Sequence, residues 1–147
     1  MITYRAAMRG DLKKVAEMIL LIYNEDNTFD SLYAECLELH ASERDTLQVA
    51  FDGDNAVGFA HCALRFDYVE GTDGGTIGYL EGIYVDPQYR LQGVARTLVA
   101  ECQAWNRAKG CAEFASDCVI DNLESLRFHL SIGFAEVSRN IHFVKKI

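Results

Sequence analysis

The chain has 147 residues, half of them hydrophobic, and carries a formal net charge of −8. This length suits one domain and is short for two, so we expect a single domain over residues 1–147. The acidic balance argues against a nucleic acid as partner, because binding to a phosphate backbone needs a basic surface. It fits a cationic partner, although acidity can also serve solubility alone.

Neither the cysteines nor the first residues indicate a secreted, metal-binding or membrane protein. The five cysteines are widely spaced and include no C-x-x-C pair, which argues against a zinc site and against a disulfide framework. We expect reduced, buried thiols in a cytoplasmic protein and no metal. Residues 1–5 do not resemble a signal peptide, and the apolar stretch 12–23 is short and interrupted by charges, so no membrane span is expected.

The first half of the chain is predicted to contain one strand, two helices and a hairpin. The expected ranges are 2–6 for the strand, 12–22 and 32–39 for the helices, 47–51 and 57–66 for the hairpin strands, and 23–31 for an acidic loop. Asp11 is expected to cap the first helix, in which apolar residues recur at helical spacing. The run 52–55 is a strong turn signal between the two hairpin strands.

The second half alternates strands and helices. We expect a loop over 68–76, a buried strand over 77–85, a helix from 93 to about 109, a strand over 114–117, a helix around 123–130, and one or two closing strands over 134–144. Gly110 and Gly133 are placed to end the two helices. Strand–helix–strand units favour parallel pairing and a hairpin adds antiparallel neighbours, so the order predicts a mixed sheet flanked by helices.

The most informative stretch, residues 79–95, runs from the buried strand through a short turn into a helix that begins with small residues. The first turn of a helix offers unpaired backbone N–H groups and a positive dipole end. Gly93 and Ala95 carry almost no side chain, so a phosphate can approach this backbone closely. The stretch therefore predicts a pyrophosphate-binding turn, and the alternative is an ordinary strand-to-helix connection.

The spacing R-x-x-G-x-A, formed by Arg90, Gly93 and Ala95, resembles the acetyl-CoA signature of the GCN5-related N-acetyltransferase (GNAT) superfamily. The resemblance implies an α/β (α+β) fold with a mixed, mostly antiparallel sheet, a central parallel strand pair and about four flanking helices. It also implies that these backbone amides hold the pyrophosphate and that the preceding strand pairs with the pantetheine arm. The implied acetyl-CoA contacts are Ile83, Tyr84, Val85, Arg90, Leu91, Gln92, Gly93, Val94, Ala95, Arg96 and Asn122. Asn122 opens the last helix, so capping that helix is an alternative role for it.

Glu81 lies inside the otherwise apolar strand of residues 77–85, where an unpartnered carboxylate is costly to bury. It must therefore pair with a cation or line a cleft. In a cleft it can help remove the proton from an acceptor amine, directly or through water, before the amine attacks the thioester. Asp117, at the end of the next strand, is a second candidate to hold or deprotonate the amine, with a turn or cap as its alternative role.

The chemistry also needs an oxyanion donor and a general acid. A backbone N–H within residues 83–85 would serve the oxyanion. Many GNAT members protonate the departing thiolate with a tyrosine that precedes the G-F after the last helix. Here that G-F is Gly133-Phe134, and the matching residue is His129. This departure leaves open whether His129 is the general acid or an ordinary residue of the helix face.

Three further stretches, residues 67–72, 79–85 and 113–122, resemble the aminoglycoside 6′-N-acetyltransferases of that superfamily. This resemblance extends over nearly the whole chain and implies acetylation of the 6′-amine of drugs such as kanamycin and tobramycin, which gives resistance. It places the drug contacts on Tyr23, Asp26, Tyr68, Glu81 and Asp117. The first loop departs from these enzymes, because it reads Ile22-Tyr23-Asn24 where they often read L-W-P.

An aminoglycoside carries several ammonium groups, so a carboxylate-rich site suits it, although single acidic residues of the loops are equally well explained as solvated surface. Two other functions stay open. One is a GNAT enzyme for a polyamine, amino acid or protein amine, and the other is a non-catalytic domain that only binds acetyl-CoA. Relatives of this type are commonly homodimers, so the resemblance also implies a homodimer, with the C-terminal strand as a place for pairing.

Overall fold

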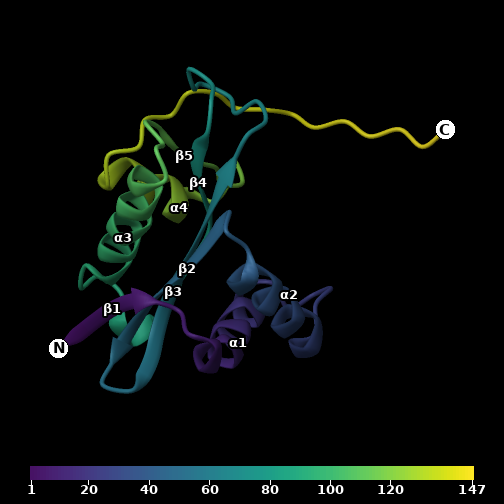
Figure 1. Cartoon of the computed structure of the whole chain (residues 1–147). Coiled ribbons are helices and arrows are strands. Elements are labelled where there is room, and N and C mark those ends of the chain that lie inside the picture. Colours follow the sequence, from purple (N-terminus) through teal and green to yellow (C-terminus); the bar gives the residue numbers. More distant parts are fainter.

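Five strands form one sheet in the order β1-β2-β3-β4-β5 in the computed structural model, which describes all of residues 1–147 (Figure 1). The strands are β1 (Ile2–Ala6), β2 (Asp45–Asp52), β3 (Asn55–Arg65), β4 (Ile77–Val85) and β5 (Phe114–Ser116). The first three pairings are antiparallel and β4 pairs with β5 in parallel. The predicted mixed, mostly antiparallel sheet is therefore confirmed, with the parallel pair at the end of the sheet rather than in its middle.

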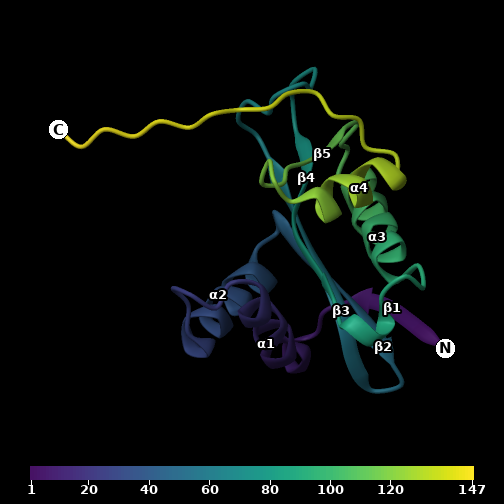
Figure 2. The ribbon, with the colours of Figure 1, turned by 180° about the vertical axis from the view of Figure 1, so that it is seen from behind.

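Helices cover both faces of this sheet, as Figure 1 and Figure 2 show from opposite sides. They are α1 (Leu12–Ile22), α2 (Phe29–Ala41), α3 (Val94–Ala108) and α4 (Leu123–Ser131), with short 3-10 turns at Arg9–Asp11 and Pro87–Tyr89. On one face, α1 and α2 pack on a core that includes Val49 and Phe59. On the other face, α3 and α4 pack on a core that includes Ala60, Leu80 and Leu98. The order of elements is the predicted one up to residue 133.

The C-terminal segment differs from the sequence-based prediction. Residues 134–147 form neither helix nor strand, so the expected closing strands over 134–144 are wrong. Val137 still touches the body, because it lies against Gly71. Beyond it the chain runs away from the sheet (Figure 1, Figure 2). Large apolar side chains such as that of Phe143 are exposed there. A strand needs a neighbour for its backbone groups, and this segment has none within its own chain.

The helix starts also show how local chemistry sets the fold. Asp11 does not cap α1 as predicted, because a 3-10 turn precedes the helix and puts Asp11 itself in helical conformation. Its carboxylate instead accepts hydrogen bonds from the Met8 N–H at 2.7 Å and from Arg5. Thr28 caps α2, since its hydroxyl accepts the Ser31 N–H at 3.1 Å, and this cap starts α2 three residues before the predicted position.

All five cysteines are free: Cys36, Cys62 and Cys102 are buried, Cys111 is half-buried and Cys118 is exposed. None of the helices has the length and apolar character that crossing a membrane requires.

Candidate active site

The register of β3 against β4 contains a β-bulge at Glu81. His61 lies opposite Gly82 and Cys62 lies opposite Leu80, so Glu81 is the extra residue on β4. The bulge explains why Leu80 and Ile83 both pack beneath α3, which strict alternation along a strand would forbid. Bulges re-aim side chains and are frequent beside active sites. Here the bulge turns a carboxylate out of an apolar strand and leaves its side chain 26% exposed.

A second interruption opens the sheet next to this bulge. The parallel pairing of β4 with β5 ends at the Leu80–Ser116 pair, after only three pairs. Residues 81–85 of β4 therefore have no strand neighbour on that side. The backbone of Ile83, Tyr84 and Val85 remains paired to β3 on the other side, which holds this free edge in extended form. Such an edge can pair with an extended ligand.

The turn after β4 presents a row of backbone amides at the start of α3. Leu91 and Gly93 both have left-handed backbone conformations, with φ of 60° and 84°. Among the backbone hydrogen bonds of turns, loops and helix ends, none has the N–H of a residue from 91 to 96 as its donor. A Cβ built on Gly93 meets nothing within 4 Å, so the space in front of this turn is open. This is the arrangement of free donors that binds phosphate at a helix N-terminus.

The side chains around this turn secure it rather than face the open space. The Arg90 Nε–H donates to the Val85 carbonyl at 2.8 Å, and Gln92 donates to the Gln88 carbonyl at 3.0 Å. Arg96 donates to the Ser131 carbonyl, which ties α3 to α4. Anion binding here would therefore rest on the backbone. Of the neighbouring predicted contacts, Val94 is buried, Ala95 is partly buried where the first turn of α3 packs on the core, and Leu91 is fully exposed.

Glu81 and Asp117 are brought into one network by two residues that the sequence analysis did not single out. Arg65 binds Glu81 with two hydrogen bonds, of 2.9 and 2.8 Å. The Arg65 guanidinium also lies 3.4 Å from the centre of the Tyr79 ring, and the Tyr79 hydroxyl donates to Asp117. The cation pairing that was one of two alternatives for Glu81 is thus present, and Glu81 also borders the opening in the sheet.

The protonation of this network follows from its contacts. Burial raises the pKa of Tyr79 most, and the hydrogen bond to Asp117 raises it further. The phenol therefore stays protonated and acts as the hydrogen-bond donor to Asp117. The hydrogen bonds to Glu81 raise the pKa of Arg65, so the guanidinium stays charged. The cost of burying a carboxylate predicted that Glu81 pairs with a cation or lines a cleft. The side-chain contacts in the structure identify the cation as Arg65.

His129 lies at the opening between β4 and β5. Its Nε2 is 2.7 Å from the Ser116 Oγ, and its Nδ1 is 2.7 Å from the Ser125 carbonyl oxygen. The ring packs against Phe134, with 5.2 Å between ring centres. Asn122 takes the capping role that was its alternative, because its Oδ1 accepts the Ser125 N–H at 3.1 Å.

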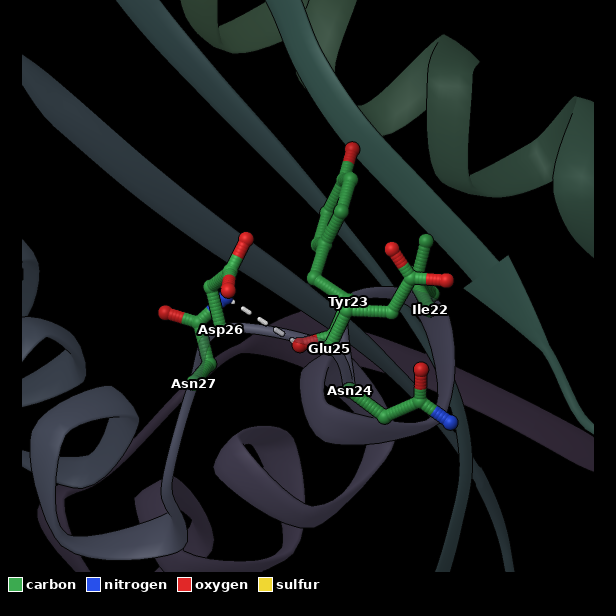
Figure 3. Close-up of a pocket in the computed structure, with 6 residues that line it drawn as sticks. All are labelled: Ile22, Tyr23, Asn24, Glu25, Asp26 and Asn27. Atoms are coloured by element: carbon green, nitrogen blue, oxygen red, sulfur yellow. Dashed lines mark hydrogen bonds between the residues drawn. The ribbon is translucent and has the colours of Figure 1, made fainter.

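Two hollows contain predicted drug contacts. One, of about 260 Å³, is formed by residues 22–27, where Tyr23 and Asp26 point the same way and Asn27 donates to the Tyr23 carbonyl (Figure 3). The other, of about 420 Å³, is lined by Arg44 and residues 64–68 and so contains Arg65 and the exposed Tyr68. The Tyr68 hydroxyl donates a hydrogen bond of 2.7 Å to the Glu70 carboxylate. No group of three or more acidic, histidine or cysteine side chains is arranged to hold a metal ion.

Known proteins share both the sequence and the fold. The family model described as "Acetyltransferase (GNAT) family" matches residues 12–134. The aminoglycoside N(6′)-acetyltransferase type 1 of Acinetobacter haemolyticus is 39% identical over 80% of this chain and 83% of its own length. The enzyme of the same name from Serratia marcescens is 44% identical over 78% of this chain and 79% of its own.

Among solved structures, the aminoglycoside N-acetyltransferase AAC(6′)-Iy in complex with CoA matches with a TM-score of 0.95 and 31% identity, covering 100% of this chain and 96% of that one. AAC(6′)-Iy in complex with the bisubstrate analogue CoA-S-monomethyl-acetylneamine matches with a TM-score of 0.94 and 31% identity, covering 100% and 99%. The free edge of β4, the amide turn and these likenesses agree, and the chain belongs to the acetyltransferase (GNAT) family, in the branch of the aminoglycoside 6′-N-acetyltransferases.

Proposed function

We propose that this protein transfers the acetyl group of acetyl-CoA to the 6′-amine of aminoglycosides and so confers resistance to them. The observation that carries the proposal is the position of the Glu81 and Asp117 network, which borders the free edge of β4 only a few residues before the amide turn. The relatives with this sequence pattern bear the name of that activity.

In this proposal the amides of residues 91–96 bind the pyrophosphate of acetyl-CoA, and the free edge at residues 83–85 pairs with its pantetheine arm. A backbone N–H of the same edge binds the oxygen that becomes negative during attack. Helix α3 supports the turn from behind, because Val94 is buried in the core.

The acceptor amine must lose a proton before it can attack the thioester carbon. Glu81 accepts that proton, directly or through water, and Asp117 holds the amine. Tyr23, Asp26 and Tyr68 contact the rest of the drug, whose ammonium groups suit the acidic loops. When the carbon–sulfur bond breaks, the CoA thiolate takes up a proton supplied by His129, which lies at the opening between β4 and β5.

The test measures CoA release against a panel of amines: kanamycin, tobramycin, spermidine, an amino acid and a lysine peptide. We expect turnover with the two drugs. Turnover with only spermidine, the amino acid or the peptide would replace the proposal by a GNAT enzyme of another amine. Tight binding of CoA in calorimetry without acetylation of any amine would replace it by a non-catalytic acetyl-CoA-binding domain.

Glu81→Gln tests the base within the same assay. We expect kcat/KM to fall by about 10²–10⁴-fold while the affinity for acetyl-CoA stays nearly unchanged, because general base catalysis typically contributes that much. Glu101→Gln is the matched control, since Glu101 is exposed on α3. Unaltered turnover of Glu81→Gln would remove this carboxylate from the mechanism.

We also propose that the chain works as a cytoplasmic homodimer, with its C-terminal segment lying on a second copy. The C-terminal segment extends from the body (Figure 2). The side chains of Ile141, Phe143 and Val144 in this segment are exposed. Strand β5 is also the last strand of the sheet, so one of its edges is free. Sedimentation should give a dimer for the full chain and a monomer for a chain that stops at Ser138. A monomeric full chain would contradict the proposal.

A further inference from the structure

Ser116, which no likeness singles out, occupies the point where β4 and β5 separate. It is the last residue of β5 and lies opposite Leu80, the last paired residue before the free edge of β4. Its hydroxyl oxygen is 2.7 Å from the His129 Nε2 and 3.3 Å from the Leu80 carbonyl oxygen. A single hydroxyl thus stands between a titratable ring and the opening in the sheet.

The contacts of His129 fix which of its nitrogens carries a proton. Its Nδ1 lies 2.7 Å from the Ser125 carbonyl oxygen, and a carbonyl can only accept, so Nδ1 carries the hydrogen. In the neutral ring Nε2 is then an acceptor, and the Ser116 hydroxyl is its donor. When Nε2 is protonated, it donates to the Ser116 Oγ, and the serine proton turns to another acceptor such as the Leu80 carbonyl. The two orientations of this hydroxyl match the two protonation states of the ring.

The surroundings separate this pair from the carboxylates of the site. The hydrogen-bond partners of His129 are all uncharged, because they are the hydroxyls of Ser116 and Ser125 and the Ser125 carbonyl. Aromatic rings of Phe128 and Phe134 pack against the imidazole. The two carboxylates at this end of the sheet are held by Arg65 and by Tyr79, so neither binds the ring. The proton on Nε2 therefore has one route toward the opening, through Ser116.

We propose that Ser116 is a catalytic residue that passes a proton from His129 to the departing CoA thiolate. The inference rests on the proposed acetyl transfer. As the amine nitrogen bonds to the acetyl carbon and the carbon–sulfur bond breaks, the sulfur takes the proton of the Ser116 hydroxyl. The Ser116 oxygen takes the Nε2 proton at the same time, so His129 becomes neutral and Ser116 is unchanged. The ring then regains a proton from solvent, which completes the balance.

The experiment compares Ser116→Ala, His129→Gln and the double variant with the wild type, using an aminoglycoside that the wild type acetylates. We expect kcat to fall by about 10–100-fold in each single variant, because each loses part of the contribution of the general acid. The KM for acetyl-CoA should stay within about two-fold of the wild-type value. Ser116→Thr, which keeps a hydroxyl, should retain most of the activity. Ser131→Ala is the matched control, because its hydroxyl donates to the Phe128 carbonyl on the same helix as His129 without touching the ring.

The double variant decides between a relay and two separate roles. Groups that act in one chain of proton transfer give strongly non-additive effects, so the double variant should be about as slow as the slower single variant. A double variant as slow as the product of the two single effects would overturn the relay. An acetyl group found on Ser116 by mass spectrometry would also overturn it, because the serine would then be a nucleophile. Failure of the wild type to acetylate any aminoglycoside would instead refute the proposed function, so the two failures are distinct.

Discussion

Helix α3 has a glycine in left-handed conformation at each end, and this pairing allows a controlled test of the amide turn. Gly93 precedes the helix with φ of 84°, and Gly110 follows it with φ of 88°. A Cβ added at either glycine would meet nothing within 4 Å. An alanine at either site would therefore meet the same backbone strain and the same open surroundings. The two sites lie roughly 22 Å apart, at the two ends of a helix of 15 residues. Only Gly93 lies in the proposed pyrophosphate site.

Alanine at either position should cost a similar amount of stability. The left-handed conformation costs an L-residue roughly 1–2 kcal/mol. The smaller entropy of the unfolded alanine chain offsets about 0.4–1 kcal/mol of that. A net loss of about 1 kcal/mol corresponds to a fall in Tm of roughly 3 °C for a chain of this size. Gly93→Ala and Gly110→Ala should therefore melt at nearly the same temperature without ligand.

Their affinities for acetyl-CoA should differ. The methyl group of Gly93→Ala projects into the open space in front of the amides, whereas that of Gly110→Ala lies at the far end of the helix. We expect the Kd measured by calorimetry to rise at least about ten-fold for Gly93→Ala, equivalent to about 1.4 kcal/mol, and to change less than about two-fold for Gly110→Ala. Equal affinities in the two variants, at equal Tm, would refute the assignment of this turn to the pyrophosphate.

Two further predictions concern stability. Gly78→Ala would put a methyl group 2.4–2.7 Å from the carboxamide of buried Asn106. The free energy of unfolding measured in urea should therefore fall by about 1–3 kcal/mol. Removing the clashing carboxamide should remove this cost, so the double variant with Asn106→Ala should be no less stable than Asn106→Ala alone. The hydrogen bond from Arg5 holds the pKa of Asp11 below its usual value. Asp11→Asn should therefore be less stable than wild type above about pH 4, with a difference that disappears as the pH falls through the lowered pKa. A difference that does not shrink as the pH falls below about 4 would contradict this account.

The sequence predicted the elements that depend on local pattern. The apolar run of β4, the helical spacing of α3 and the positions of Gly93 and Gly110 each follow from neighbouring residues, and the structure confirms them. The network around Glu81 could not be predicted in the same way. Its partner Arg65 is 16 residues away in the sequence and lies on the neighbouring strand, so no local pattern indicates the contact. Burial cost predicted either a cation partner or a cleft for Glu81, and the structure was needed to identify Arg65 as the partner.

The prediction of strands in the C-terminal segment was wrong for a related reason. Apolar residues over 134–144 predicted strands, yet a strand is defined by its neighbour as much as by its own residues. In this chain the segment leaves the body after Val137 and has no strand neighbour within the same copy. A pattern read from one chain cannot distinguish a strand that pairs within the copy from one that pairs across two copies.

The position of the candidate site follows from two interruptions of regular structure. The bulge at Glu81 turns a carboxylate out of a buried strand, and the early end of β5 at Ser116 frees the next five residues of β4 from any neighbour on that side. Either one alone would leave the site incomplete. Without the bulge Glu81 would lie in the regular ladder, and with a longer β5 the edge at residues 83–85 would already be paired. Because the two interruptions lie at adjacent residues of β4, the carboxylate, the free edge and the Ser116–His129 pair meet at one place.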